Sequence, residues 1–272
     1  MSDKRAIGVF DSGLGGLTVV KELIKALPNE SIVYFGDTGR VPYGTRSVET
    51  IKKYAKQDEE FLLNQDVKLI IAACGTVSSV AGDIALDLPV PYFEVVSHSA
   101  KAAVKATKNG KIAVIGTSAT VNSRQHEKEI LKLMPSASVL NQSCSLFVPL
   151  VEEGWYEADD IVVVETVRRY LKPIIDFKPD TLILGCTHYP ILSDVIKKVL
   201  GDEVTLINAG TAVAESLTEF LKENGLENGG ENLPEYRYYV SDKPDSFVKQ
   251  ASILIGRQVD GNKVLKVDIN NL

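Results

Sequence analysis

The chain has 272 residues, of which 44% are hydrophobic and 24% are charged, as is typical of a soluble globular protein. Its formal net charge of −6 argues against a nucleic acid or an anionic membrane as a partner, because both favour basic surfaces. No apolar run reaches the length of a membrane-spanning helix, and the first residues lack the pattern of a secretory leader.

Short apolar runs alternate with amphipathic segments along most of the chain. The runs predict strands, which we expect at residues 5–10, 31–37, 68–73, 92–96, 111–116, 181–185 and 203–208. The segments between them predict helices, the clearest at residues 15–27, 47–65 and 77–86. Ser47 is expected to cap the second of these helices. Apolar strands separated by helices predict mostly parallel sheets covered on both faces, the doubly wound α/β fold.

We expect two such domains with a cleft between them. The first comprises residues 1–97 and 209–272, and the second comprises residues 98–208. Each then contains one of two similar strand ends, at Cys74 and Cys186, which lie about one domain length apart.

Four loops at or just after predicted strand ends carry polar residues. They are residues 10–16 ("FDSGLGG"), 41–45 ("VPYGT"), 73–76 ("ACGT") and 185–188 ("GCTH"). In a doubly wound fold, ligands bind beyond the carboxyl ends of the strands. Helix N-termini at that edge offer unpaired N–H groups, which hold carboxylates and lower the pKa of a nearby thiol. The loops therefore predict one shared site.

Cys74 and Cys186 each follow an apolar strand and precede a threonine, directly or after a glycine. Taken singly, each would be interpreted as a core thiol, because free cysteine is commonly buried. The repetition favours a functional role for both. Cys144 has no such setting and is interpreted as structural. The three cysteines form no CxxC motif, so we expect reduced thiols and a cytoplasmic location.

The glycine-rich loop between Gly13 and Gly16 has an alternative interpretation as a dinucleotide-binding fingerprint. The match is poor, because Thr18 stands where the third glycine or alanine belongs. The charge of Asp11, just before the turn, would also face the pyrophosphate. Nucleotide binding is therefore a weak alternative.

His188 is two residues from Cys186 in a chain with three histidines, which favours a functional residue over an ordinary buried histidine. A zinc site would need further Cys or His at metal spacing, so we expect no metal. A hydrolytic pair of these two residues would leave Cys74 unexplained. Asp11, between a strand and a glycine-rich turn, is a further candidate, whereas Glu152 would not be selected by pattern alone.

In combination, the blocks "GVFDSGLGGLTV", "GDTGRVPYG", "AACGTVSS", "FVPLVEEG" and "LILGCTHYP" resemble the signature blocks of bacterial glutamate racemase, in the same order and over most of the chain. The resemblance implies two α/β domains with the active site in the cleft between them, and a racemase that interconverts L- and D-glutamate without a cofactor. It also implies a role in supplying D-glutamate for peptidoglycan, and so in cell-wall biogenesis and cell shape. The oligomeric state is not fixed by the sequence, which leaves a homodimer open.

Residue by residue, the resemblance implies that Cys74 and Cys186 are the catalytic cysteines of a two-base mechanism, assisted by Asp11, Glu152 and His188. Each thiol would serve one face of the substrate. Cys74 would take the Cα proton from D-glutamate, and Cys186 would take it from L-glutamate. Substrate-binding positions are implied for Asp11, Ser12, Tyr43, Gly44, Gly75, Thr76, Thr187 and His188. By pattern alone, the tyrosine also fits packing and the two threonines fit helix caps.

The chain departs from the family pattern after the first cysteine, where Gly75 replaces the usual Asn, whose side chain contacts substrate. That contact must come from a backbone N–H, a water or another residue. The departure keeps open a racemase for aspartate, another amino acid or hydantoin. A second alternative is a non-catalytic binding protein or a protein partner such as an inhibitor of gyrase, although the presence of both cysteines weighs against lost catalysis.

Overall fold

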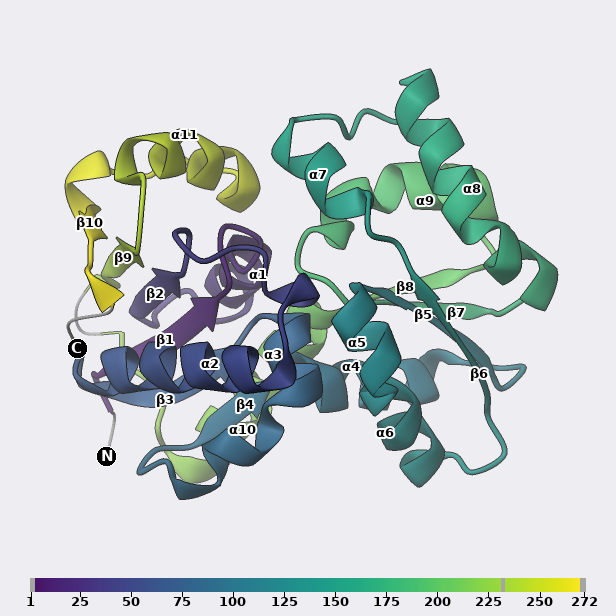
Figure 1. Ribbon diagram of the computed structural model, residues 1–272. Coiled ribbons are helices and arrows are strands. Elements are labelled where there is room, and N and C mark those ends of the chain that lie inside the picture. Colours follow the sequence, from purple (N-terminus) through teal and green to yellow (C-terminus); the bar gives the residue numbers. More distant parts are fainter. Residues whose placement is uncertain (1–2, 231–232, 270–272) are drawn as a thin grey trace.

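The computed structural model describes residues 3–230 and 233–269, which form two parallel sheets with helices packed on them (Figure 1). The strand order is β10–β9–β2–β1–β3–β4 in the first sheet and β6–β5–β7–β8 in the second. The strands of the first sheet are β1 (Ala6–Asp11), β2 (Ile32–Gly36), β3 (Val67–Ala72), β4 (Tyr92–Glu94), β9 (Tyr236–Val240) and β10 (Val264–Lys266). Those of the second are β5 (Lys111–Gly116), β6 (Ser138–Ser143), β7 (Thr181–Leu184) and β8 (Thr205–Asn208). The predicted doubly wound α/β class is confirmed.

Helices connect these strands. The α-helices are α1 (Leu17–Ala26), α2 (Val48–Leu63), α3 (Gly75–Val80), α4 (Val95–Ala106), α5 (Ser118–Ser123), α6 (Gln125–Leu133), α7 (Phe147–Glu152), α8 (Ile161–Phe177), α9 (Ser193–Leu200), α10 (Ala209–Asn224) and α11 (Pro244–Ile255). Short 3-10 helices are η1 (Tyr43–Thr45), η2 (Gly82–Asp87), η3 (Tyr189–Leu192) and η4 (Gly261–Lys263). Within the described residues, no helix combines the length and the apolar character needed to cross a bilayer.

The central strands β1, β2, β3, β5 and β7 are buried on both faces, which explains why they are apolar without alternation. Along β1, Ile7 and Val9 pack in one core and Phe10 packs in the core on the opposite face. Helices α1, α10 and α11 cover the first of these faces, and α2 and α3 cover the second. The second sheet lies in the same way between α7, α8 and α9 on one face and α4 and α6 on the other.

Local signals account for most element boundaries, and two of them differ from expectation. Ser47 caps α2 as predicted, because its hydroxyl accepts a hydrogen bond from the backbone N–H of Thr50. The helix expected over 77–86 begins instead at Gly75 and gives way to η2 near Gly82, a residue type that weakens helices. The strand expected over 92–96 ends early, because the Glu94 carboxylate accepts hydrogen bonds from the backbone N–H groups that begin α4.

The chain passes to the second sheet through α4 and returns through α10, which packs against α1, before adding β9 and β10 to the first sheet. The predicted division at residues 97/98 and 208/209 remains a prediction. The first of these boundaries lies inside α4, whose Val95 belongs to the core of the first sheet while Ala100 and Ala103 belong to that of the second.

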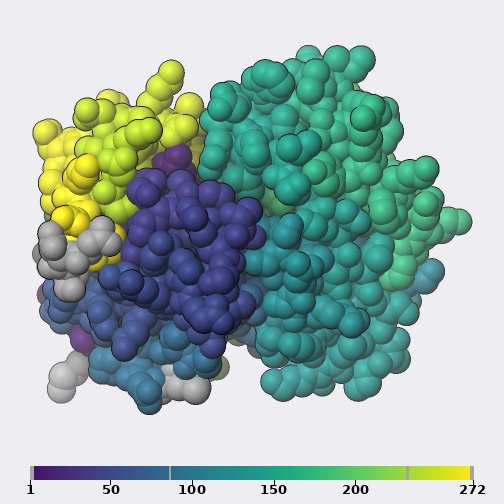
Figure 2. Space-filling view, viewed as in Figure 1, coloured from purple at the N-terminus to yellow at the C-terminus, as the bar shows by residue number. Residues whose placement is uncertain are grey.

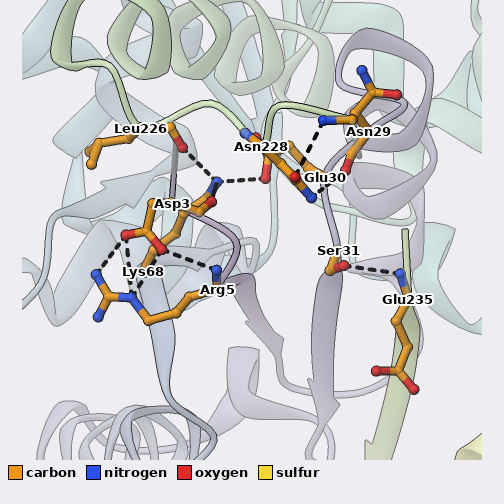
Figure 3. Close-up of polar contacts among 10 residues, drawn as sticks. Asp3, Arg5, Asn29, Glu30, Ser31, Lys68, Leu226, Asn228 and Glu235 are labelled. Atoms are coloured by element: carbon orange, nitrogen blue, oxygen red, sulfur yellow. Dashed lines mark hydrogen bonds and ion pairs between the residues drawn. The ribbon is translucent and has the colours of Figure 1, made fainter. Parts of the chain in front are cut away.

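A buried ion pair fastens the returning segment to the amino-terminal end of the first sheet (Figure 3). Lys68, on β3, donates to the Glu30 carboxylate at 2.6 Å and to the backbone carbonyls of Asp3 and Leu226. The other oxygen of Glu30 accepts from the backbone N–H of Asn228. Because both charges are buried and paired, this cluster joins four separate parts of the chain at the end opposite to the loops of the candidate site.

Candidate active site

A cavity of about 290 Å³ lies between the carboxyl ends of the two sheets and contains both Cys74 and Cys186 in its lining. The first follows β3 of one sheet and the second follows β7 of the other. Figure 2 shows the two halves of the molecule side by side, the purple and blue atoms of the first against the teal atoms of the second. The residues that line the cavity are Ser12, Gly13, Val41, Pro42, Tyr43, Gly44, Thr45, Cys74, Gly75, Thr76, Thr117, Ser118, Ser145, Val148, Pro149, Glu152, Cys186, Thr187, His188 and Tyr189.

Cys74 occupies the N-cap position of α3, and its thiol lies 3.7 Å from the hydroxyl oxygen of Ser12. Burial raises the pKa of this thiol to about 12, and the negative charge of Asp11 adds to the effect. At neutral pH Cys74 is therefore a protonated thiol. In this form it is an acid, ready to give a proton to a carbanion.

Cys186 stands in a different setting, beside a histidine and a glutamate. Its sulfur lies 3.8 Å from His188 Nδ1, and His188 Nε2 lies 3.1 Å from Oε1 of Glu152, which comes from α7. Burial alone would lower the pKa of His188, but its hydrogen bonds to Cys186 and Glu152 and the nearby negative charges raise it to about 10. An imidazolium at this position stabilises negative charge on the Cys186 sulfur.

Asp11 lies between the two cysteine loops rather than on one of them. Its buried carboxylate accepts a hydrogen bond from the backbone N–H of Gly13 and a long one, at 3.4 Å, from the hydroxyl of Thr187. Burial raises the pKa of Asp11, while the positive charge of His188 opposes the shift. The charge of Asp11 thus acts on both the Cys74 thiol and His188.

Tyr43 lines the cavity, but its hydroxyl points away from it. The hydroxyl contacts the carboxylates of Asp37 and Asp58, which are both fully buried. Any contact of Tyr43 with a ligand must therefore come from its backbone or ring. The neighbouring Gly44 packs so closely on Thr117 that an added Cβ would lie 2.9 Å from the threonine Cβ.

Gly75 is enclosed by the backbone of the opposite cysteine loop. A Cβ atom at this position would overlap the carbonyl oxygen of Gly185, the residue before Cys186. The two loops that carry the cysteines thus meet backbone to backbone. Space, rather than a polar contact, explains why a residue without a side chain stands here.

Sequence reasoning missed several polar residues of the cavity. The hydroxyl of Thr117 lies 3.0 Å from that of Thr76, and Ser118 and Ser145 also line the cavity. Thr117 follows the apolar strand 111–116, so the strand-end signal used for the other loops could have found it. Cys144 is buried outside the lining, where its carbonyl accepts a hydrogen bond from Tyr189. Among the described residues, no group of three His, Cys, Asp or Glu side chains is placed to hold a metal ion.

Comparisons with known proteins show the family and the fold of the chain. Residues 7–217 match the family model described as Asp/Glu/Hydantoin racemase. The chain is 46% identical over 256 residues to a glutamate racemase of Syntrophus aciditrophicus, covering 94% of each chain. It is 44% identical over 259 residues to one from Neisseria meningitidis, covering 94% of this chain and 95% of the relative. The crystal structure of the Francisella tularensis glutamate racemase in complex with D-glutamate superposes with a TM-score of 0.91 at 39% identity, covering 99% of this chain and all of that one.

Proposed function

The chain belongs to the Asp/Glu/Hydantoin racemase family and is an amino-acid racemase, and we propose that it interconverts L- and D-glutamate with Cys74 and Cys186 as its two acid–base groups. One observation carries the proposal: two thiols from two different sheets line the same cavity. Racemisation removes the Cα proton from one face of the substrate and returns a proton to the other. Two groups on opposite walls perform this without moving around the substrate.

The two cysteines stand in different surroundings before substrate binds. Cys74 carries a proton, since its pKa is raised to about 12, whereas Cys186 has the His188 imidazolium 3.8 Å away. In the direction from L- to D-glutamate, Cys186 takes the Cα proton as a thiolate and Cys74 delivers its own. The reverse direction uses the same path backwards, with Cys74 as base and Cys186 as acid.

The proton that is removed is far less acidic than a thiol, whose unperturbed pKa is about 8.5. Most of the rate acceleration must therefore come from stabilising the negative charge that develops on the substrate. We assign the carboxylate contacts to the hydroxyls and backbone N–H groups of Ser12, Gly44, Gly75, Thr76 and Thr187. Substrate that fills the cavity displaces water from it, which strengthens these contacts.

Glutamate is favoured over aspartate or hydantoin by the relatives, which are glutamate racemases at 41–46% identity. The product, D-glutamate, would serve peptidoglycan synthesis, and so cell-wall biogenesis and cell shape. The reduced cysteines support a cytoplasmic location. We propose that the protein forms a homodimer. Sedimentation velocity distinguishes this assembly from a monomer.

Circular dichroism of L-glutamate incubated with the purified protein tests the activity. We expect the signal to decay to zero with no added cofactor or metal. Cys74→Ser and Cys186→Ser should each abolish the decay, while Cys144→Ser, which changes a buried thiol outside the cavity, should keep it. A stable signal with L-glutamate, or decay with L-aspartate in its place, would contradict the proposal, and native rates in either active-site variant would return that cysteine to a core role.

A further inference from the structure

Two buried carboxyl groups approach the same phenolic oxygen behind the loop formed by residues 41–45, which lines the cavity. The Tyr43 hydroxyl contacts Oδ2 of Asp37 and lies 3.0 Å from Oδ2 of Asp58. Both carboxyl groups are completely inaccessible to solvent. A phenol has one hydrogen to donate, so it cannot donate to both carboxylates at once. A second hydrogen must be present in the cluster.

Asp37 has three hydrogen-bond donors around it, which favour its ionised form. Its Oδ2 accepts from Arg40 Nε at 2.6 Å as well as from Tyr43. Its Oδ1 accepts from the Ser241 hydroxyl at 2.7 Å, and the oxygen of that hydroxyl accepts from the backbone N–H of Gly39. Both oxygens of Asp37 therefore act as acceptors, as in an ionised carboxylate.

Asp58 has one oxygen that lacks a donor. Its Oδ1 accepts from Arg40 Nη2 at 3.1 Å, but its Oδ2 faces the Tyr43 oxygen, whose hydrogen points to Asp37. A proton on Asp58 Oδ2 completes the chain of hydrogen bonds, from Asp58 to Tyr43 to Asp37. It also balances the charge, since the single guanidinium of Arg40 then faces a single carboxylate where both carboxyl groups are buried.

The titratable groups that face Asp58 favour the same state. They are Asp37 at the end of β2, Arg40 and Tyr43 from the following loop, and Glu59 on α2. Burial raises the pKa of Asp58 well above its usual range, the charge of Asp37 adds to this, and Arg40 opposes it.

We propose that Asp58 is a positioning residue that holds a proton, donates it in a hydrogen bond to Tyr43, and thereby fixes the cavity loop 41–45. The inference rests on the proposed function in one respect, namely that this loop binds the substrate. Asp58 itself does not line the cavity. Its effect on catalysis passes through Tyr43, whose ring also packs on Tyr54 with centroids 5.4 Å apart.

The two carboxyl groups give opposite expectations for replacement by asparagine. Asp58→Asn keeps an acceptor for Arg40 and supplies an N–H donor to Tyr43, so KM should stay within about threefold of the native value. Asp58→Ala loses both and should raise KM about tenfold or more, with a smaller change in kcat. Asp37→Asn has one acceptor oxygen where the native group uses two, so it should behave like the alanine variant.

A stability measurement separates the inference from the proposed function, because it needs no activity. The unfolded chain releases the Asp58 proton above its ordinary pKa and the folded chain keeps it, so the native Asp58 lowers stability increasingly as pH rises. Asp58→Asn should therefore be more stable than the native protein at about pH 8, and the gain should shrink towards about pH 5. An infrared difference spectrum of the two proteins at neutral pH should also show the loss of one protonated-carboxyl band.

Three results would overturn the inference. They are an Asp58→Asn protein that is less stable than the native one at neutral pH, the absence of the protonated-carboxyl band, and an Asp37→Asn variant that is tolerated while Asp58→Asn is not. Should Asp37→Asn fail to fold, the comparison of Asp58→Asn with Asp58→Ala and the infrared spectrum decide the question. Inactivity of the native protein towards glutamate would refute the proposed function and leave these stability and infrared results to judge Asp58.

Discussion

Replacing Glu152 by glutamine tests whether the carboxylate acts on Cys186 through His188. Glutamine keeps the shape of the side chain and a hydrogen-bonding oxygen at the 3.1 Å contact with His188 Nε2, but it removes the negative charge. The charge is one of the causes that raise the pKa of His188 to about 10. We therefore expect a lower pKa for His188 and weaker stabilisation of negative charge on Cys186.

The size of the effect follows from the contact and its exposure. A hydrogen bond to a charged group contributes about 1.5–3 kcal/mol. The Glu152 side chain is 44% exposed, so solvent screens part of its charge and we expect about 1–2 kcal/mol. At 1.4 kcal/mol per factor of ten, this corresponds to a loss of about 5- to 30-fold in kcat/KM.

Circular dichroism followed from each enantiomer measures the loss, and NMR titration of the His188 ring measures the pKa. Because the equilibrium constant between mirror-image substrates is one, kcat/KM must fall equally in both directions. Glu153→Gln removes the same charge one residue further along, outside the cavity lining, and should leave the rate unchanged. A Glu152→Gln enzyme with native kcat/KM and an unshifted His188 titration would refute the proposed role.

Three further predictions concern packing and charge. Gly75→Ala should lower kcat/KM at least about tenfold, since the new methyl group overlaps the Gly185 carbonyl and forces the cysteine loops apart. Gly82→Ala, with no atom within 4 Å of the added carbon, should match the native enzyme. Equal rates in the two variants would contradict this prediction. Lys68→Met should lower the free energy of unfolding in urea by about 3–5 kcal/mol, because it leaves the buried Glu30 carboxylate without its cation. The value of kcat should be nearly unchanged. A stability equal to that of the native protein would show that the ion pair is not needed. The free energy of unfolding should fall as pH rises from about 6.5 to about 10, since folded His188 keeps a proton that the unfolded chain releases. The buried Asp58 and Cys74 contribute to the same fall, so the slope should be shallower by about one proton in the His188→Gln variant. An unchanged slope in that variant would exclude a contribution from His188.

The sequence predicts the buried parallel strands well, because strands covered on both faces are continuously apolar. It does not reveal β6, whose residues "SVLNQS" are half-buried or exposed at the edge of the second sheet. It also does not reveal β9 and β10, which join the first sheet only after the chain has crossed to the second and returned. Edge strands and long-range returns leave a weak local pattern, since their pairing depends on distant segments.

In the candidate site too, some residues can be predicted from the sequence and others cannot. Cys74, Cys186 and Asp11 stand out because each breaks an apolar run at a strand end. Glu152 belongs to an ordinary helical segment, and its contact with His188 arises only when α7 packs beside the Cys186 loop.

The burial of the Tyr43 hydroxyl could not be predicted, because Asp37 and Asp58 reach it from a strand end and from the facing side of a helix. The absence of a side chain at Gly75 was likewise explained only by its contact with Gly185.

The central claim, that each cysteine serves one face of the substrate, is tested most directly by turnover of a single enantiomer in heavy water. With two bases, the proton removed by one thiol stays on that side while the other thiol delivers a deuteron equilibrated with solvent. Mass spectrometry or proton NMR should then find deuterium at Cα of the product enantiomer well before it appears in the remaining substrate. Return of the substrate's own proton to the product, with deuterium entering both pools together, would mean that one base serves both faces and would contradict the account.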